Sequence, residues 1–227
     1  MLTSHQKLVI QYISQYVTEH KRNFIEKVLA QRTRYVTVVL EDIYQSQNAS
    51  AVIRTCECMG IQDVHIIENT NMYSTNRNVL KGADKWMTLH RYRDNTHNQT
   101  QMCFEELKKK GYKIVATDPR EVNLTVHDID LSQPVAIIMG NELHGLSNYS
   151  YQHCDERVSI PMYGFTGSLN LSVSAAICIE SIIKRIHQMD IPIGLQIEQK
   201  EALRYDWYKK IVRRSSIIER EFLRTIA

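Results

Sequence analysis

The sequence predicts an α/β fold in which a parallel β-sheet carries helices on both faces. Short β-branched apolar segments alternate with longer amphipathic ones through most of the chain, the pattern that parallel sheets with crossover helices produce. A length of 227 residues suits one packed domain with appendages, or two small domains. Sheets of this class bind ligands beyond the carboxyl ends of their strands, so the loops there are the first place to look for chemistry.

The elements follow from hydrophobic spacing. The first thirty residues predict helix, with Asn23 and Glu26 as a capping pair inside them. Strands are expected near 36–41, 63–68, 87–92, 112–117, 134–139 and 157–161, and helices near 49–59, 76–82, 99–110, 147–153 and 170–188. Residues 190–194 resemble a linker. A basic helical segment then spans 196–226, with an apolar stripe at Leu203, Trp207, Ile211, Ile218 and Phe222.

We therefore divide the chain into a helical N-terminal extension (1–34), an α/β domain (35–189) and a basic helical C-terminal extension (190–227). Positive charge follows this division. Residues 1–34 hold six Lys/Arg against two Glu, residues 196–227 hold eight against five acidic residues, and the middle is acidic apart from 77–93. Basic ends are typical of a protein that binds a polyanion, although solvated helices also carry excess Lys and Arg.

Composition excludes several classes. No apolar run approaches the roughly eighteen residues of a membrane span, and the N-terminus lacks the pattern of a secretion signal. The five cysteines show no metal-ligand spacing, so we interpret all of them as reduced packing residues and expect a cytoplasmic protein without a metal. The glycine fingerprints of dinucleotide and P-loop sites are absent, which argues against a Rossmann-type oxidoreductase.

Three strand-to-helix junctions carry unusual polar sequences. At 48–55, Asn48 is placed to cap the following helix and Arg54 lies six residues on; a capped helix with a solvated arginine explains the same pattern. At 139–147, Gly140 follows a buried strand and permits close approach of a ligand, Glu142 adds a carboxylate, and Ser147 is placed to cap a helix; a plain glycine-rich turn is the alternative.

The third junction, at 160–174, passes from Pro161 through two glycines into a helix with small polar residues. Such a loop presents backbone donors and acceptors to a ligand, or forms a tight turn with a polar cap.

Together, in this order, the junctions resemble the three motifs of the SPOUT RNA methyltransferases, in the SpoU/TrmH branch that methylates ribose 2′-hydroxyls. The resemblance covers about residues 36–187. The first motif matches at Asn48, Ala51, Arg54 and Thr55, the second at Gly140, Glu142 and Gly145, and the third at Ile160, Pro161, Met162, Ser168, Leu169, Asn170 and Ser172. Leu171 stands where the family usually has Val.

The resemblance implies a C-terminal trefoil knot, a homodimer, and S-adenosylmethionine bound in the knot. It implies a cofactor pocket lined by four residues: Thr117, Gly140, Ile160 and Leu169. It makes Arg54 the central catalytic residue, with the ribose and that arginine oriented by Asn48, Glu142, Ser168 and Asn170. Because a guanidinium releases a proton only above about pH 12, we expect Arg54 to hold a phosphate and stabilise alkoxide charge.

The helical ends resemble the branch that methylates a D-loop guanosine of tRNA, because only 35 residues precede the segment that carries the resemblance, where relatives acting on ribosomal RNA usually have a sizeable domain. A ribosomal RNA ribose 2′-O-methyltransferase is the alternative within the class. A non-catalytic RNA-binding protein on the same scaffold is the alternative outside it.

Overall fold

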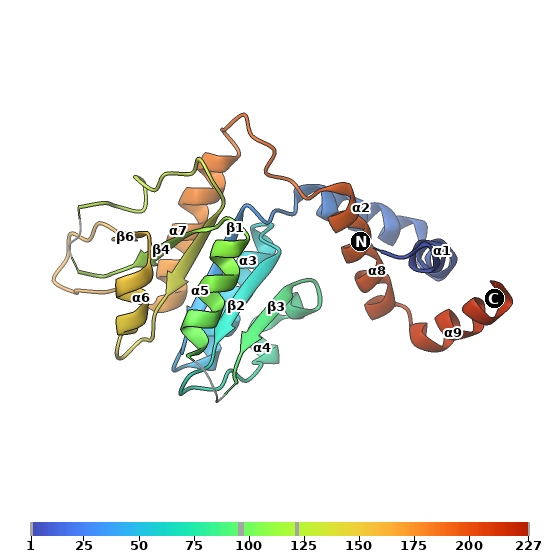
Figure 1. Cartoon of the computed structure of the whole chain (residues 1–227), viewed down its shortest axis with the longest axis horizontal. Helices are drawn as coiled ribbons and strands as arrows, with labels where there is room; N and C mark the ends of the chain where they lie inside the picture. The colour runs from blue at the N-terminus through green and yellow to red at the C-terminus, as the bar shows by residue number, and fades with distance from the viewer. Residues whose placement is uncertain (1, 95–97, 121–122, 227) are drawn as a thin grey trace. The chain divides into compact units, whose positions relative to one another are not determined.

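The computed structural model describes residues 2–94, 98–120 and 123–226 (Figure 1). It divides into two compact units, one spanning Arg34–Ile193 and the other joining the residues up to Thr33 with those from Gly194 onward. The two terminal segments therefore belong to one unit. The division of the chain into an N-terminal, a central and a C-terminal part remains a prediction.

The larger unit is built on a six-stranded sheet in the order β3-β2-β1-β5-β4-β6. All neighbouring strands run parallel, which confirms the predicted class. The strands are β1 (Val36–Glu41), β2 (Asp63–Ile67), β3 (Thr88–Tyr92), β4 (Lys113–Thr117), β5 (Val135–Met139) and β6 (Glu156–Val158). Their centres agree with the sequence expectations; β6 ends earlier than predicted.

Helices pack on both faces of the sheet, as predicted. They are α3 (Ser46–Cys58), α4 (Arg77–Leu80), the 3₁₀ turn η2 (Ala83–Lys85), α5 (Gln99–Lys109), α6 (Asn148–His153) and α7 (Leu171–Ile186). Alternate residues of β1 point to opposite faces. Val38 and Leu40 join a core with α3 and α7, whereas Val39 joins a second core with α5.

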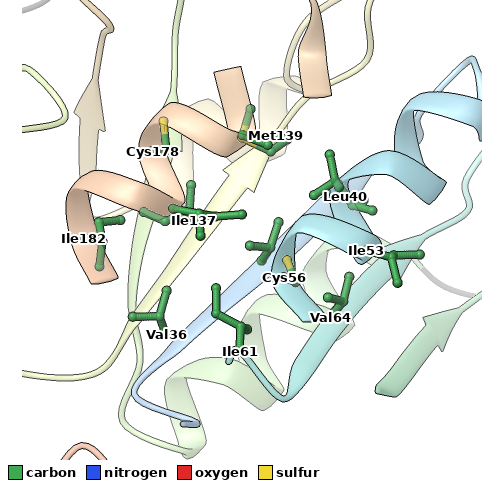
Figure 2. Packing of buried hydrophobic residues seen from close by; sticks show 14 of the residues in the cluster. Val36, Leu40, Ile53, Cys56, Ile61, Val64, Ile137, Met139, Cys178 and Ile182 are labelled. Atoms are coloured by element: carbon green, nitrogen blue, oxygen red, sulfur yellow. The ribbon is translucent and has the colours of Figure 1, made fainter. Parts of the chain in front are cut away.

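Figure 2 shows the first of these cores, where Cys56 of α3 and Cys178 of α7 lie among aliphatic side chains. All five cysteines lie in the described part of the chain, and none of them forms a disulfide. Cys103 is also buried and Cys154 is half-buried, but Cys58 is exposed, so the interpretation of every cysteine as a packing residue was wrong for Cys58.

Strand order places a natural crevice between β1 and β5. From β1 the chain moves outward through β2 and β3, and the other three strands lie on the opposite side of β1. The helix after β1, α3, packs on one face, whereas Tyr149 and Tyr151 of α6, the helix after β5, pack on the other. Connections that diverge in this way leave space above the carboxyl ends of the two strands.

The smaller unit is helical. It contains α1 (Ser4–Ile13), the 3₁₀ turn η1 (Ser14–Tyr16), α2 (Glu19–Gln31), α8 (Ile197–Ile211) and α9 (Ser215–Ile226). Thr18 caps α2, with its hydroxyl 3.4 Å from the Lys21 amide, so the predicted capping pair was wrong: Asn23 and Glu26 lie inside the helix.

Trp207 on α8 is the largest fully buried side chain of this unit, and the guanidinium of Arg32 lies 5.5 Å above its ring. In the predicted apolar stripe, Leu203 and Trp207 are buried, whereas Ile211, Ile218 and Phe222 are only half-buried. It is interrupted between the two helices at Arg214, whose φ of 57° ends the helical path. In the described part of the chain, no helix has the length and apolarity to cross a membrane.

Candidate functional site

A cavity of about 680 Å³ opens beyond the carboxyl ends of β4 and β5. We call it the loop cavity. Its walls come from the first turn of α3, from the loops at 117–120, 139–146, 158–162 and 168–171, and from residues of α6 and α7. The three junctions singled out in the sequence thus meet at the crevice that strand order creates.

Eight of the nine residues predicted for the site line the loop cavity. They are Asn48, Thr117, Gly140, Glu142, Ile160, Ser168, Leu169 and Asn170. Their placement in one cavity makes a shared role feasible, and the individual roles stay predictions.

Glu142 connects the first two junctions. Its carboxylate accepts hydrogen bonds from the backbone N–H groups of Tyr44 (2.8 Å) and Gln45 (3.2 Å), and from the Asn48 side-chain amide (2.9 Å). A carboxylate with three N–H donors is held in one orientation, and its charge lies at the positive N-terminal end of α3. Glu142 therefore holds α3 to the loop after β5.

Asn48 connects this pair to the third junction. Its side-chain oxygen accepts a hydrogen bond from the Asn170 amide at 3.3 Å. Asn170 is fixed in turn because its own side-chain oxygen caps α7, accepting from the Ser172 N–H at 2.9 Å. A chain of hydrogen bonds from Glu142 through Asn48 to Asn170 thus joins residues up to 122 positions apart.

One local sequence interpretation at these residues was wrong, and the structure gives a further reason for a glycine at another. Asn48 does not cap its helix, because α3 already begins at Ser46 after an N-cap at Gln45. At Gly140 the close approach is made by the protein's own backbone: a Cβ there would lie 2.6 Å from the carbonyl carbon of Gly145. Gly140 therefore allows the loop to fold back on itself, with a pair of backbone hydrogen bonds between Asn141 and Gly145. Ser147 caps α6, as predicted.

The remaining lining residues supply a mixed surface. The Thr117 hydroxyl donates to the carbonyl of Ile138 at 2.8 Å, which orients its side chain at the end of β4. Ile160 and Leu169 present apolar side chains, and Leu169 is 41% exposed. No hydrogen bond fixes the Ser168 hydroxyl among the described residues, so it is free to turn toward a ligand.

Arg54 is the exception among the predicted residues. It lies on α3, exposed, and is not part of the lining of the loop cavity. Its Nη1 is 3.5 Å from the carbonyl oxygen of Val79, at the end of α4. One copy of the chain therefore does not bring this arginine to the cavity.

Residues 35–180 match the model of the SpoU rRNA Methylase family. The chain belongs to the SpoU methylase family. This confirms the family resemblance predicted from the three junctions, and with it the assignment of the chain as a methyltransferase.

Two SpoU relatives are described as tRNA (guanosine(18)-2′-O)-methyltransferase. The one from Borreliella burgdorferi is 40% identical over 207 residues, which are 91% of this chain and 93% of the relative. The one from Thermus thermophilus is 34% identical over 160 residues, 70% of this chain and 80% of the relative.

Among solved structures, the A. aeolicus TrmH/SpoU tRNA modifying enzyme has a TM-score of 0.75 at 24% identity, covering 86% of this chain and 98% of that one. The SpoU methyltransferase AviRb from Streptomyces viridochromogenes, in complex with AdoMet, has a TM-score of 0.59 at 22% identity, covering 72% and 65%. At these identities the likeness concerns the fold.

Two features of this SpoU chain were missed in the sequence. The first is Glu41, a buried carboxylate at the end of β1. It accepts hydrogen bonds from the Ser147 backbone (3.0 Å) and from the hydroxyls of Ser147, Ser150 and Thr100 (2.8 Å each). Glu41 therefore anchors the end of the 139–147 loop, and the signal for it was a charged residue closing an otherwise apolar strand.

The second is a group of three residues in the cavity lining, Asp118, Arg120 and Tyr151. Arg120 pairs with the buried Asp118 at 2.9 Å, and its guanidinium lies 4.8 Å above the Tyr151 ring. Burial raises the pKa of Asp118, but hydrogen bonds from the Arg120 side chain and backbone lower it more, so this pKa lies below its ordinary value. The signal was a polar Thr-Asp-Pro-Arg run directly after β4.

Proposed function

We propose that this chain transfers a methyl group from S-adenosylmethionine to the ribose 2′-hydroxyl of guanosine 18 in tRNA. The observation that carries the proposal is the convergence of Asn48, Glu142 and Asn170 on one cavity. The relative from Borreliella burgdorferi, matched over nearly its whole length and described by this reaction, supports the choice of substrate.

The residues of the loop cavity fit the cofactor. Its volume of about 680 Å³ lies within the range of small-molecule sites, which combine apolar walls with a few placed polar groups. Ile160 and Leu169 would form the apolar wall for the adenine, while the turns at Thr117 and Gly140 offer backbone groups to the polar parts. When bound, the cofactor supplies an electron-poor methyl group on a sulfonium.

The chain's own residues would act mainly by positioning. Transfer needs the ribose oxygen, the methyl carbon and the sulfur nearly in line, so a fixed geometry lowers the barrier. Asn48 and Asn170, each fixed by hydrogen bonds at both of its side-chain atoms, would orient the ribose together with the Ser168 hydroxyl. Glu142 would hold Asn48 in place.

Arg54 would bind the neighbouring phosphate and stabilise the negative charge that develops on the ribose oxygen as the hydroxyl proton passes to water. Its guanidinium keeps its proton at physiological pH, so it acts as a charge rather than a base. Because Arg54 does not line the cavity of its own chain, we propose a homodimer in which each copy completes the other's site.

A mixing experiment tests the shared site. Arg54→Ala and Asn170→Ala are each expected to be inactive alone. If the arginine acts in the partner's cavity, the mixed dimers of an equal mixture have one intact site of two, which returns about a quarter of wild-type activity. If the arginine acts in its own chain, the mixture stays inactive.

The trefoil knot is proposed on the path of residues 123–131 and 159–171. The backbone of Val126 donates to Ser159, and the side chains of His127 and Ser181 on α7 are 3.1 Å apart. Arg185 of α7 also donates to the Ile129 carbonyl at 2.6 Å. Residues 126–129 therefore lie along both the chain that leaves β6 and α7, an arrangement that supports threading of the later segment through the earlier loop.

The basic helical ends are proposed to bind tRNA phosphates, an interaction that weakens as salt rises. The internal basic segment at 77–93 is less available. Its Arg91 forms a salt bridge with Glu68, with the closest atoms 2.5 Å apart, so we do not propose that it binds phosphate. With tRNA as substrate, we place the enzyme's work in the cytoplasm.

Mass spectrometry of nucleosides tests the function directly. Purified protein and labelled cofactor are incubated with an unmodified tRNA transcript, with the same transcript carrying adenosine at position 18, and with ribosomal RNA. We expect 2′-O-methylguanosine in the first alone. Methylation of the ribosomal RNA alone would instead support the activity that the family's description names.

A further inference from the structure

The loop between β6 and α7 carries two fully exposed aromatic rings. Tyr163 is 97% exposed and Phe165 is 112% exposed, the highest values among the large hydrophobic residues that the structure describes. Aromatic rings are usually buried because their transfer from water is favourable, so two exposed rings in three residues point to a ligand or partner.

The rings lie at the rim of the loop cavity. Met162, directly before them, lines the cavity, and Ser168 and Leu169, directly after the loop, line it as well. Gly164 and Gly167 have no other described atom within 4 Å of the position a Cβ would take, so this segment projects from the body of the protein. The two rings therefore lie on a projecting segment whose two ends line the cavity.

The chemistry of the loop favours a flat, apolar ligand. Residues 159–170 contain no charged side chain, so the loop offers little to a phosphate. Nucleobases have flat faces, and unpaired bases stack on aromatic side chains without regard to sequence. In the proposed reaction a ribose enters the cavity, and its own base or the next one lies within a few ångströms of it.

We propose that Tyr163 and Phe165 stack on unpaired bases of the RNA at or beside the methylated nucleotide. This inference rests on the proposed function and adds to it a substrate-binding element that the sequence motifs do not include. A second copy of the chain is the other occupant to consider. The RNA is the better fit, because the proposed reaction brings a ribose, and with it a base, into the cavity that residues on both sides of the two rings line.

Stacking predicts a specific signature. Each stacked base contributes about fivefold to a hundredfold in affinity. The slope of log Kd against log salt concentration reports phosphate contacts, which these rings do not make. Their loss should raise Kd by a similar factor at every salt concentration and leave the slope unchanged.

The test uses full-length Tyr163→Ala, Phe165→Ala and double variants with an unmodified tRNA transcript. Fluorescence anisotropy at several salt concentrations gives Kd for the RNA, calorimetry gives Kd for S-adenosylmethionine, and light scattering gives the oligomeric state. Met102→Ala, which truncates an exposed side chain on α5, is the matched control. Tyr163→Phe keeps a flat ring and should keep the affinity.

We expect the double variant to bind tRNA at least tenfold more weakly than wild type, with unchanged salt slope, cofactor affinity and oligomeric state. An unchanged Kd for the RNA, or a changed salt slope, overturns the inference. A loss of oligomer in the double variant overturns it too, and assigns the rings to contact between copies. If wild type does not methylate guanosine 18, the proposed function fails whatever the variants bind, and the reason to expect a base at this rim is lost.

Discussion

The loop cavity and the helical unit at the chain's ends are held together in different ways. At the cavity, side chains from distant segments hydrogen-bond to one another, as Glu142 does with Asn48 and Asn48 with Asn170. In the helical unit, the helices pack around the buried Trp207, and the side-chain contacts between them include partly exposed ion pairs such as Arg204 with Glu26. The loop cavity therefore has the fixed side-chain geometry that catalysis needs, whereas individual charged residues of the helical unit can be replaced with less effect.

The largest effect on activity is expected at Arg54. In a single chain, this residue lies neither in the lining of the loop cavity nor in the helical unit. Arg54→Ala should lower kcat about a thousandfold or more, because the transition state loses its electrostatic stabilisation. The Kd for S-adenosylmethionine, measured by calorimetry, should stay within about twofold because Arg54 lies outside the cavity lining. A variant that keeps most of its activity would remove this arginine from the mechanism.

Glu142 tests the precision of the cavity itself. Glu142→Gln keeps the size of the side chain but replaces one acceptor oxygen with a donor that faces N–H groups. We expect kcat to fall about a hundredfold, because loss of a fixed geometry costs this much. Single-turnover kinetics with circular dichroism as the folding control would measure it. Activity near wild type would mean that Asn48 does not depend on this carboxylate.

Acid should weaken the larger unit through His65. Burial, followed by the nearby charge of His90, lowers the pKa of His65 to about 3, while the unfolded chain has a value near 6.5. The unfolded state therefore binds the extra proton first, and the free energy of unfolding falls as pH drops from about 6.5 toward 3. At pH 5 the expected loss is about 2 kcal/mol.

Urea unfolding at pH 7 and pH 5 would measure that loss, with His65→Gln as the variant that cannot titrate. Its free energy of unfolding should change less between the two pH values than that of wild type. An equal change in both proteins would assign the acid sensitivity to other groups.

The smallest effect is expected in the helical unit. Arg204→Ala removes an exposed ion pair between α8 and α2, whose atoms lie 2.6 Å apart. Such pairs contribute about 1 kcal/mol or less to the free energy of unfolding, so the midpoint of thermal unfolding should move by only a few degrees. A large drop would show that this unit is as precisely constrained as the cavity.

Sequence patterns predicted the framework well because each depends on neighbours along the chain. Strand runs such as 36–41 and the cap at Ser147 are local signals, and the structure confirms them. The motif residues were found through family resemblance, which summarises long-range geometry that spacing alone does not contain.

The errors share a physical origin. Asn48 has the right chemistry for a cap, but its partner Glu142 is 94 residues away, and no local rule includes that contact. Local spacing also did not show that the loop of Gly140 folds back on itself, so that a Cβ there would meet the Gly145 backbone. The role of Arg54 stays a prediction, because it rests on the proposed partner chain.

The helical unit has a consequence for how this protein is made. Its first two helices are synthesised before the α/β domain, yet they pack against α8, which is synthesised after that domain. Until then, apolar side chains such as Val9, Ile13 and Leu29 lack part of their final cover. While the α/β domain is being synthesised, these helices therefore expose apolar surface, to which chaperones can bind.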